Sequence, residues 1–395
     1  MGVERVIEII FWLFLFIIFY AYIGYGILLF FLVNMKKIFV KKVPTTNDDY
    51  EPEVTLFVAA YNEKDFLDQK LKNSYSLDYP KEKVHQIWVT DGSDDGTPDL
   101  LRKYDGVEVY HKPERAGKIA AMNRGMEFVK TPIVIFSDGN TVLGKESIRR
   151  IVNLFRDPKV GCVSGEKRVA LSGSTAATEG IYWKYESALK KWDAELNTVV
   201  GAAGELFAVR TELHETIEPD TLLDDFIISL RIAKQGYKIQ YDPEAYALEN
   251  PSASVREELK RKVRISAGGI QSIVRLKELL NPFKYGLLSF QYISHRVLRW
   301  TLAPLGLPVI LVCNLFLALH EGIFNFMNIY PWLFWGQILF YIAALAGWLL
   351  EDKNIKVKLL YIPFYFFIMN LAVYLGFFRY IKKTQSVNWE RAKRG

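Results

Sequence analysis

The segment Ile133 to Leu143 reads IVIFSDGNTVL, an apolar run that ends in an acid. A short apolar run bounded by a polar turn is typical of a buried β-strand. The acid is Asp138, and two residues later, where a metal-binding pair would have a second carboxylate, the chain has Asn140. The segment therefore indicates either a strand that ends in an ordinary turn or a strand that carries a metal ligand.

Three similar runs precede this segment. They read VTLFVAA (54–60), VHQIWVT (84–90) and VEVYHK (107–112), and each is followed by a polar turn and a helix-like stretch such as GKIAAMNRGMEFV (117–129). Strands that alternate with helices predict an α/β layer structure with a mainly parallel sheet. Ligands bind to such sheets beyond the carboxyl ends of the strands.

Polar triplets stand at three of these strand ends: Tyr61-Asn62-Glu63, Asp91-Gly92-Ser93 and Asp138-Gly139-Asn140. Acids at the ends of two different strands suit a nucleotide diphosphate with a divalent cation, because one carboxylate can fix the metal while another binds the base. Acids and glycines at strand ends also make ordinary turns. For any one triplet alone, both interpretations stay open.

The apolar residues of the 395-residue chain gather at its two ends. Ile9 to Val33 carries no charge and, at ~1.5 Å per residue, would extend for about 38 Å as a helix, longer than the ~30 Å hydrocarbon core. We therefore expect an uncleaved transmembrane anchor at residues 1–35 and transmembrane helices at 299–380. The second group rests on three uncharged runs, Thr301 to Leu319, Gly322 to Leu350 and Leu359 to Phe378.

Between these ends we expect a polar domain at 50–250 and amphipathic helices on the membrane surface at 251–298. The stretch VREELKRKVRISAGGIQSIVRLK (255–277) interleaves Lys and Arg with apolar residues, as helices on an anionic leaflet do. Its position between apolar runs and its lack of a recognition motif argue against nucleic-acid binding. Two cysteines and five scattered histidines offer neither a disulfide framework nor a paired zinc-ligand spacing.

The charges that flank the apolar runs predict orientation. Lysines follow the anchor within Lys36–Lys42, so the positive-inside rule places the polar domain in the cytoplasm. The tail at 381–395 is also basic, yet four full spans would return it to the outside. Either one apolar segment lies in the interface or the tail is an exception. The Thr301 to Leu319 run, with Pro304 and Pro308, is the weakest candidate for a straight span.

Five motifs, in this order and spacing, resemble the family 2 glycosyltransferases with the GT-A fold: AAYNE (59–63), VTDGSDDGT (89–97), AGKIAAMN (116–123), FSDGN (136–140) and LLDD (222–225). The flanking apolar runs make the chain similar to the membrane-integrated branch, which includes the synthases of cellulose, hyaluronan, chitin oligomers and poly-N-acetylglucosamine. The resemblance covers over half of the chain. It implies a GT-A catalytic domain with a Rossmann-like, mostly parallel sheet, joined to α-helical transmembrane segments.

The resemblance implies a binding site for a UDP-sugar donor. Tyr61 would lie against the uracil with Glu63 nearby, and Asp91 would contact the uracil or the ribose. Lys118, with Asn123 one turn further on, would face the diphosphate, where amide groups of a helix N-terminus also converge.

The resemblance also implies a metal site and a general base. Asp138 would hold Mg²⁺ or Mn²⁺, and Asn140 would offer a neutral amide oxygen in place of the second acid of the family. LLDD stands where the family has Thr-Glu-Asp, which assigns Asp225 as the base that deprotonates the acceptor hydroxyl, with Asp224 beside it. Two acids at a helix start also favour the helix dipole without doing chemistry.

The chain departs from the family pattern in two places. Thr90 replaces the first of two acids in the second motif, and Arg261-Lys262-Val263-Arg264-Ile265 stands in place of Gln-x-x-Arg-Trp. Arg261 and Arg264 remain candidate ligands of the diphosphate, but Ile265 replaces the Trp that in the synthases is part of the platform under the acceptor sugar. A second fragment, HRVLRW (295–300), resembles the missing motif but stands at the start of an apolar run, where Arg and Trp are also ordinary anchors of a membrane interface, and we favour the anchor interpretation.

Together these features predict a membrane-bound inverting hexosyltransferase that extends an exopolysaccharide from a UDP-sugar, with its catalytic domain in the cytoplasm at the plasma (inner) membrane. One alternative is a single transfer to a lipid acceptor, as in ceramide glucosyltransferase. Another is a catalytically inactive scaffold or transport component. The sequence indicates neither the sugar nor the oligomeric state.

Overall fold

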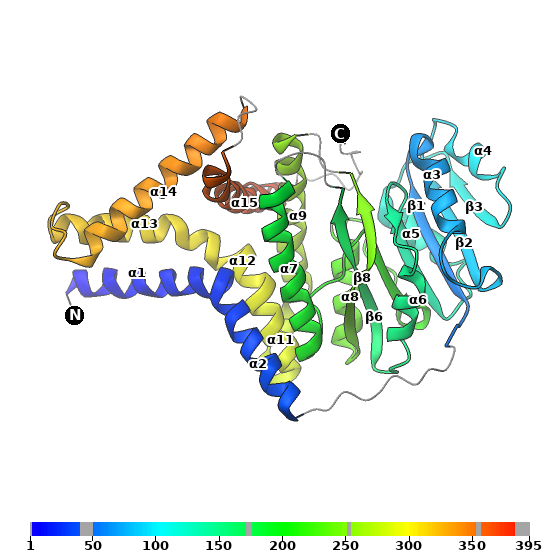
Figure 1. The fold of residues 1–395 in the computed structure, drawn as a ribbon, viewed down its shortest axis with the longest axis horizontal. Coiled ribbons are helices and arrows are strands. Elements are labelled where there is room, and N and C mark those ends of the chain that lie inside the picture. The colour runs from blue at the N-terminus through cyan, green and yellow to red at the C-terminus, as the bar shows by residue number, and fades with distance from the viewer. Residues whose placement is uncertain (1, 40–49, 171–175, 251–253, 353–356, 384–395) are drawn as a thin grey trace.

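An eight-stranded sheet lies at the centre of the polar domain (Figure 1). The computed structural model describes residues 2–39, 50–170, 176–250, 254–352 and 357–383. The strand order is β3-β2-β1-β4-β7-β6-β8-β5. The strand bounds are β1 Val54–Ala60, β2 Val84–Asp91, β3 Val107–Lys112, β4 Ile133–Asp138, β5 Val142–Leu143, β6 Val160–Val169, β7 Leu206–Arg210 and β8 Lys238–Glu249.

The sheet is mostly parallel, which confirms the predicted α/β class. Strands β1, β2, β3 and β4 all run parallel, and β6 is parallel to β8. Strand β7 runs antiparallel to both β4 and β6, and the short β5 pairs antiparallel with β8. The four runs quoted from the sequence form β1 to β4, so their polar ends meet at one edge of the sheet.

Helices cover both faces of the sheet, which explains why β1 is buried along its whole length. Phe57 and Ala59 of β1 face a core that includes residues of α5 and α8, whereas Leu56 and Val58 face a core built with α3 and α6. The helices and short turns of this domain are α3 Lys64–Tyr75, Lys81–Lys83, α4 Thr97–Leu101, α5 Lys118–Met126, α6 Ser147–Leu154, α7 Ala176–Leu196, Thr211–Leu213 and α8 Asp224–Lys234.

The remaining helices either lie beside the sheet domain or extend away from it (Figure 1). They are α1 Val3–Phe19, the π-helical turn Tyr20–Gly24, α2 Tyr25–Phe39, α9 Val255–Arg275, Lys277–Leu280, α10 Pro282–Tyr285, α11 Leu287–Tyr292, the π-helical turn Ile293–Val297, α12 Leu298–Trp300, α13 Leu302–His320, α14 Ile329–Asp352 and α15 Lys358–Ile381. Within the described residues, four helical stretches are long and apolar enough to cross a membrane: Val3–Phe39, Leu302–His320, Ile329–Glu351 and Leu359–Ile381.

The predicted anchor bends rather than forming one straight helix (Figure 1). The turn Tyr20–Gly24 separates α1, which packs along α13, from α2, which packs on α7 of the polar domain. Lys36 Nζ donates hydrogen bonds to the carbonyl oxygens of Glu195 (2.9 Å) and Leu196 (2.7 Å) at the end of α7. The first half of the anchor therefore lies with the apolar helices, and the second half lies against the polar domain.

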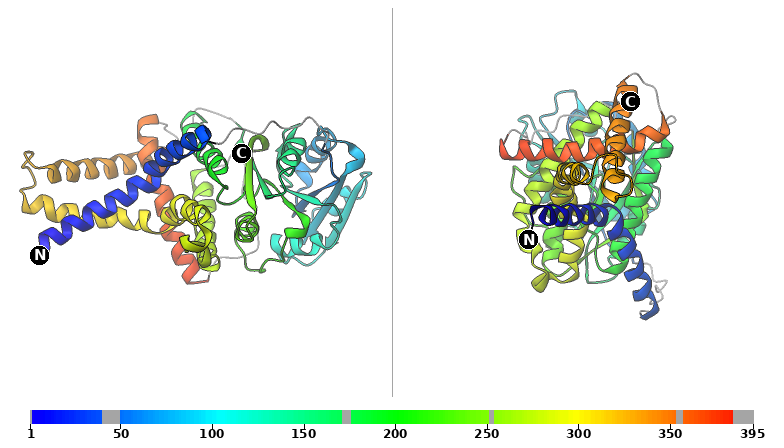
Figure 2. Two further views of the ribbon diagram at one scale, coloured as in Figure 1. Left: turned by 90° about the horizontal axis from the view of Figure 1, so that it is seen from below. Right: turned by 90° about the vertical axis from the view of Figure 1, so that its left-hand side faces the viewer.

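Helix α15 lies across the other apolar helices. Helices α1, α13 and α14 extend away from the sheet, whereas α15 runs roughly perpendicular to them at their inner ends, against α9 (Figure 2). Close contact requires small residues here, because a Cβ atom at Gly376 of α15 would lie 2.7 Å from the Ala267 backbone nitrogen of α9.

The run expected to be the weakest span, Thr301 to Leu319, instead forms the continuous helix α13 with Pro308 inside it. Of the basic tail, residues 384–395 lie outside the described part of the chain.

Candidate functional site

A cavity of about 240 Å³ lies at the edge of the sheet where the polar strand ends meet. Its walls come from the end of β4, the start of α5, the loop before β7, the start of α8, the middle of α9 and the turn of α12. Eight of the eleven predicted site residues line this cavity or the smaller pocket next to it. The cavity walls include Lys118, Asp138, Asp224, Asp225, Arg261 and Arg264.

Lys118 joins two of the predicted acids. Its Nζ atom lies 3.0 Å from Oδ1 of Asp138 and 3.2 Å from Oδ2 of Asp224. Gly117, at φ +96°, turns the chain so that α5 begins at Lys118. Burial alone would lower the pKa of Lys118, but the two carboxylates hold that pKa above its ordinary value. Burial also raises the pKa of Asp138, which Lys118 partly offsets. A fixed ammonium group thus lies between the β4 end and the α8 start.

Asp225 lies next to this ion pair but is not part of it. Its carboxylate faces Gly204, where an added Cβ atom would lie 3.4 Å from Asp225 Oδ2. Burial, together with the negative charge of Asp224, raises the pKa of Asp225 to about 8. A carboxylate with a raised pKa that lines a cavity is suited to accept a proton near neutral pH.

A second, smaller pocket adjoins the cavity at Lys118 and is lined by Tyr61, Asp91 and Arg115. The Arg115 guanidinium lies 3.7 Å from the centre of the Tyr61 ring. Asp91 Oδ2 accepts hydrogen bonds from the amide groups of Ala116 (2.9 Å) and Gly117 (2.6 Å), so it fixes the loop that leads into Lys118. This pocket contains the aromatic and acidic groups expected to bind a base and ribose.

Three predicted site residues lie outside both pockets. Glu63 is buried behind the loop after β4, where an added Cβ atom at Gly139 would lie 3.2 Å from Glu63 Cγ. Asn123 uses its whole amide group on the backbone of Ile217, at 2.8 Å to the carbonyl oxygen and 3.2 Å to the amide nitrogen. The Asn123 side chain therefore holds the segment before α8 in place, and it lies outside the cavity.

Asn140 lies two residues beyond Asp138 in the same loop. Among the described residues, its Oδ1 atom has no hydrogen-bond partner although it is shielded from solvent. The loop is supported from behind by the buried Lys70, whose Nζ donates to Ser137 Oγ (2.7 Å) and to the Thr141 carbonyl oxygen (2.9 Å). A carboxylate and an open amide oxygen on one supported loop form an oxygen ligand set of the kind that Mg²⁺ and Mn²⁺ accept.

The two arginines of α9 differ in their partners. Arg261 forms an ion pair with Glu258 through Nε and Nη2, both at 3.1 Å. Within the part of the chain that the structure describes, Arg264 has no ion pair or hydrogen bond to its side chain, and it lines the cavity. Arg264 is therefore a cation at the cavity that forms no ion pair with a carboxylate of the described residues.

The fragment at 295–300 contributes to the site, contrary to its prediction as an interfacial anchor alone. Arg296 and Trp300 both line the cavity, beside Ile265. The Trp300 ring packs edge to face on Phe226, at 5.3 Å between centroids, next to Asp225. The Arg-Trp pair was a usable signal in the sequence, but only the packing of α12 on α9 brings it to the cavity.

Glu205 is a second cavity residue that the sequence did not single out. It precedes β7 and accepts a hydrogen bond from Lys167 Nζ at 2.6 Å. Burial alone would raise its pKa, but Lys167 and Arg261 hold the pKa of Glu205 well below the ordinary value. Glu205 is thus a permanent negative charge, unlike Asp225 in the same cavity.

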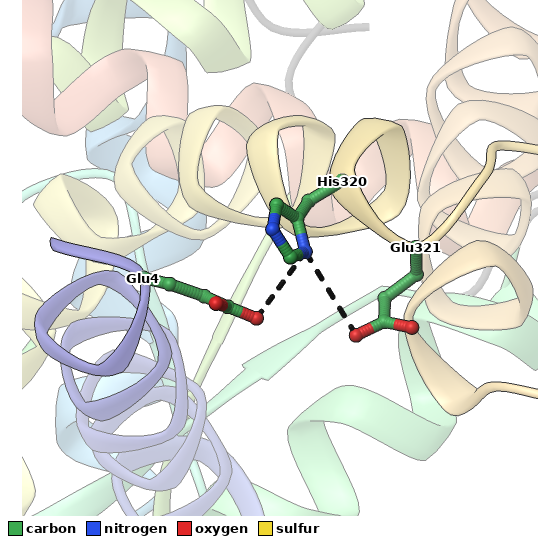
Figure 3. A group of neighbouring side chains, drawn as sticks. All are labelled: Glu4, His320 and Glu321. Atoms are coloured by element: carbon green, nitrogen blue, oxygen red, sulfur yellow. Dashed lines mark ion pairs between the residues drawn. The ribbon is translucent and has the colours of Figure 1, made fainter. Parts of the chain in front are cut away.

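A separate group of metal-ligand type lies at the far ends of α1 and α13 (Figure 3). His320 Nδ1 lies 3.3 Å from a Glu4 carboxylate oxygen and 4.0 Å from a Glu321 carboxylate oxygen. Glu4 and His320 are exposed, and ion pairs account for the arrangement. It is remote from the cavity, so we do not assign it to the site.

The chain is similar in sequence to known glycosyltransferases. The profile of the family described as "Glycosyltransferase like family 2" matches residues 52–268, more than half of the chain. The chain is 26% identical over 266 residues to the poly-beta-1,6-N-acetyl-D-glucosamine synthase of Staphylococcus aureus (strain MSSA476), an alignment that covers 63% of this chain and 62% of the synthase. It is also 26% identical over 319 residues to the probable glycosyltransferase YdaM of Bacillus subtilis (strain 168), with 75% and 74% covered.

A solved structure shares the fold over almost the whole chain. The mannosyltransferase PcManGT of Pyrobaculum calidifontis, in complex with GDP-Man and Mn²⁺, superimposes with a TM-score of 0.69 at 22% identity. The superposition covers 96% of this chain and 100% of that one. The likeness therefore extends to the apolar helices as well as to the sheet.

Proposed function

We propose, from the premise that the chain belongs to the glycosyltransferase-like family 2, that it transfers a sugar with inversion from a UDP-sugar to a growing exopolysaccharide at a membrane surface. One arrangement carries the proposal. A single cavity contains Lys118 between Asp138 and Asp224, the raised-pKa carboxylate of Asp225, and Arg264, which has no ion-pair partner among the described residues. These are the groups that a displacement of a nucleotide diphosphate needs.

The donor would lie across both pockets. The base and ribose fit the smaller pocket, where the Tyr61 ring offers an aromatic face and Asp91 orders the loop. The diphosphate would then reach Lys118, at the N-terminus of α5, and Arg264. Asp138 and Asn140 would hold Mg²⁺ or Mn²⁺, which when bound neutralises diphosphate charge.

Asp225 would act as the general base. As the acceptor hydroxyl oxygen forms a bond to the anomeric carbon, Asp225 takes the hydroxyl proton, and the bond from that carbon to the diphosphate oxygen breaks on the opposite face. The diphosphate leaves with the bonding electron pair. Lys118 and Arg264 stabilise the negative charge that develops on it.

The acceptor would approach along the wall made by Arg296 and Trp300. An aromatic face suits the apolar face of a sugar ring, and Trp300 supplies this surface where Ile265 cannot. The similarity to a poly-N-acetylglucosamine synthase favours a polysaccharide acceptor. The chain spans only 62% of the length of that synthase, so the polymer is part of the proposal.

A single transfer to a lipid acceptor is the second candidate. It is supported by α12, which carries Trp300 and leads at once into the apolar helix α13. A lipid acceptor could therefore enter the cavity along the surface of α13 from the membrane.

The directions of the helices support one membrane arrangement (Figure 2). We propose that α1, α13 and α14 cross the bilayer while α15 lies in the interface with α9, which leaves the sheet and the end of α15 on one side (Figure 2). Lys36, Lys37 and Arg379 would all belong to this side, which the positive-inside rule makes cytoplasmic. This arrangement resolves the parity problem that four full spans would create.

The test is a screen of UDP-sugars with the purified full chain in nanodiscs. We expect UDP release from one or a few donors, dependent on Mg²⁺ or Mn²⁺ and absent in EDTA. Sizing of the labelled product separates the acceptors, because a ladder indicates a polymer and one glycolipid species indicates a single transfer. A scaffold would release no UDP from any donor.

A further inference from the structure

A buried polar cluster connects α7 to the turn that carries the acceptor wall. Glu186 and Asp193 lie seven residues apart on α7 and therefore on the same face of the helix. They are 6% and 0% exposed. A buried carboxylate is costly unless it is paired and hydrogen-bonded, and the partners of both come largely from residues 291–299.

Glu186 contacts the basic side chains of this segment. Arg299 Nη1 lies 2.5 Å from Glu186 Oε1, while His295 Nε2 (3.5 Å) and Arg296 Nη1 (4.0 Å) lie near Oε2. The strongest contact is the charge-assisted bond to Arg299. Arg299 immediately precedes Trp300 in α12, so the position of the Arg299 side chain constrains the turn that carries Trp300.

Asp193 binds the beginning of the same segment. His295 Nδ1 lies 2.6 Å from Asp193 Oδ2, and Gln291 Nε2 donates to Asp193 Oδ1 at 2.9 Å. The Tyr25 hydroxyl of α2 also donates to Asp193. All of these groups are buried, so the segment is held at both ends by α7.

The cluster also reaches the bend of the first apolar helix. Arg299 Nε donates to the carbonyl oxygen of Ala21 at 2.8 Å, and the hydroxyls of Tyr20 and Ser294 lie 2.8 Å apart. The π-helical turns Tyr20–Gly24 and Ile293–Val297 meet here. π-helical turns are rare and frequently occur at functional sites.

We propose that Glu186 is a positioning residue for sugar transfer: through Arg299 and His295 it holds the turn 296–300 so that Trp300 and Arg296 face the cavity that Asp225 also lines. Glu186 itself does not line the cavity. The proposal rests on the proposed function, because it assigns Trp300 and Arg296 to the acceptor side. It predicts that loss of Glu186 affects capture of the acceptor more than cleavage of the donor.

The chain offers a matched control where α7 contacts the sheet. Glu166 of β6 is also 6% exposed and binds α7 through Lys190 Nζ at 3.1 Å and through Ser187. It also accepts a hydrogen bond from the Tyr241 hydroxyl at 2.7 Å. Glu166→Gln therefore removes an equally buried carboxylate that contacts the same helix, but from strand β6 of the sheet, away from α12.

The experiment compares Glu186→Gln with Glu166→Gln in the full chain in nanodiscs, first by hydrogen–deuterium exchange. We expect amides of residues 293–300 to exchange about tenfold faster in Glu186→Gln, because the local opening of a segment sets its exchange rate. In Glu166→Gln these amides should exchange at the wild-type rate. Unchanged exchange in Glu186→Gln would overturn the proposal. Glu186→Asp, which keeps the charge but shortens its reach, should show an intermediate rate.

The second measurement is the fraction of the cleaved sugar that is transferred to the acceptor rather than to water. Native membranes are incubated with labelled UDP-sugar of the type that the donor screen identifies, and sugar incorporated into product is divided by UDP released. We expect this ratio to fall about tenfold in Glu186→Gln, since a misplaced acceptor wall lets water compete, while total UDP release stays within about twofold. An equal fall of incorporation and UDP release in Glu186→Gln would overturn the positioning role. A wild-type chain that releases no UDP contradicts the proposed function instead, and the exchange comparison still decides the role of Glu186.

Discussion

The Trp300 indole lies directly over Gly269 of α9, where an added Cβ atom would come within 2.5 Å of the ring. This contact is possible because the α9 stretch 266–269 consists of small residues. Gly268 permits a second close approach, to Leu223, just before the acids of α8. The start of α8, Trp300 and α9 are thus packed around two glycines.

Gly269→Ala should displace Trp300 from the cavity wall. The added methyl group overpacks the contact, and overpacked sites typically lose about 1–3 kcal/mol of stability. We expect lower sugar incorporation with UDP release largely kept. Thermal unfolding and the incorporation ratio measure the two effects. Gly336→Ala in α14 is the control, because nothing lies within 4 Å of a Cβ atom there.

Asp225→Asn should abolish transfer while the protein still folds. The amide has nearly the same shape but cannot accept the hydroxyl proton, and loss of a general base typically costs about 10²- to 10⁴-fold in rate. Sugar incorporation is measured beside the melting temperature. Wild-type incorporation in Asp225→Asn would exclude Asp225 as the base.

Transfer should depend on pH through Asp225. The base acts as the carboxylate, and burial and Asp224 raise its pKa to about 8, so kcat/KM should rise with pH and level off above that value. Because this pKa is higher in the folded than in the unfolded chain, the folded state binds more protons between the two values. The free energy of unfolding contributed by Asp225 therefore falls as pH rises toward about 8. Unfolding of Asp225→Asn across this range should lack that decrease.

Asn140→Asp should strengthen metal binding. A second carboxylate would stand two residues from Asp138, and hard divalent cations prefer a charged oxygen to a neutral amide. We expect half-maximal activation at a Mn²⁺ concentration about tenfold lower than in the wild type, a change of ~1.4 kcal/mol. Asn140→Ala, which removes the oxygen, should shift activation in the opposite direction. Identical metal titrations for all three chains would show that Asn140 is not a ligand.

Lys118→Met should impair the donor step and also weaken the fold. Without the ammonium group, Asp138 and Asp224 lose the cation that lies 3.0 Å and 3.2 Å from them, and breaking a buried pair typically costs about 3–5 kcal/mol. The melting temperature and the KM for the donor report the two effects. Lys72→Met is the control, since Lys72 pairs with Asp68 on the surface of α3. An unchanged donor KM would place the diphosphate away from Lys118.

The sequence was most informative where a property is local. The runs that form β1 to β4 were predicted because each is a short apolar segment with a polar end, and parallel strands necessarily bring those ends to one edge. Strands β6, β7 and β8 were not predicted, because their role depends on partners distant in the chain. The same limit applies to Asn123, whose side chain is used on Ile217, far along the sequence.

The sequence by itself determined the fold class, the family, the apolar helices and the acids and lysine of the cavity. The apolar helices follow from long uncharged runs, and the other features are carried by short motifs whose spacing sets their geometry. Only the tertiary structure decided that Trp300 and Glu205 join that cavity and that α15 lies across the other apolar helices. Both outcomes depend on packing between segments far apart in the chain. Helix α9 can approach α12 closely only because of Gly269, and α15 only because of Gly376. The local sequence around a glycine does not indicate which helix will pack against it.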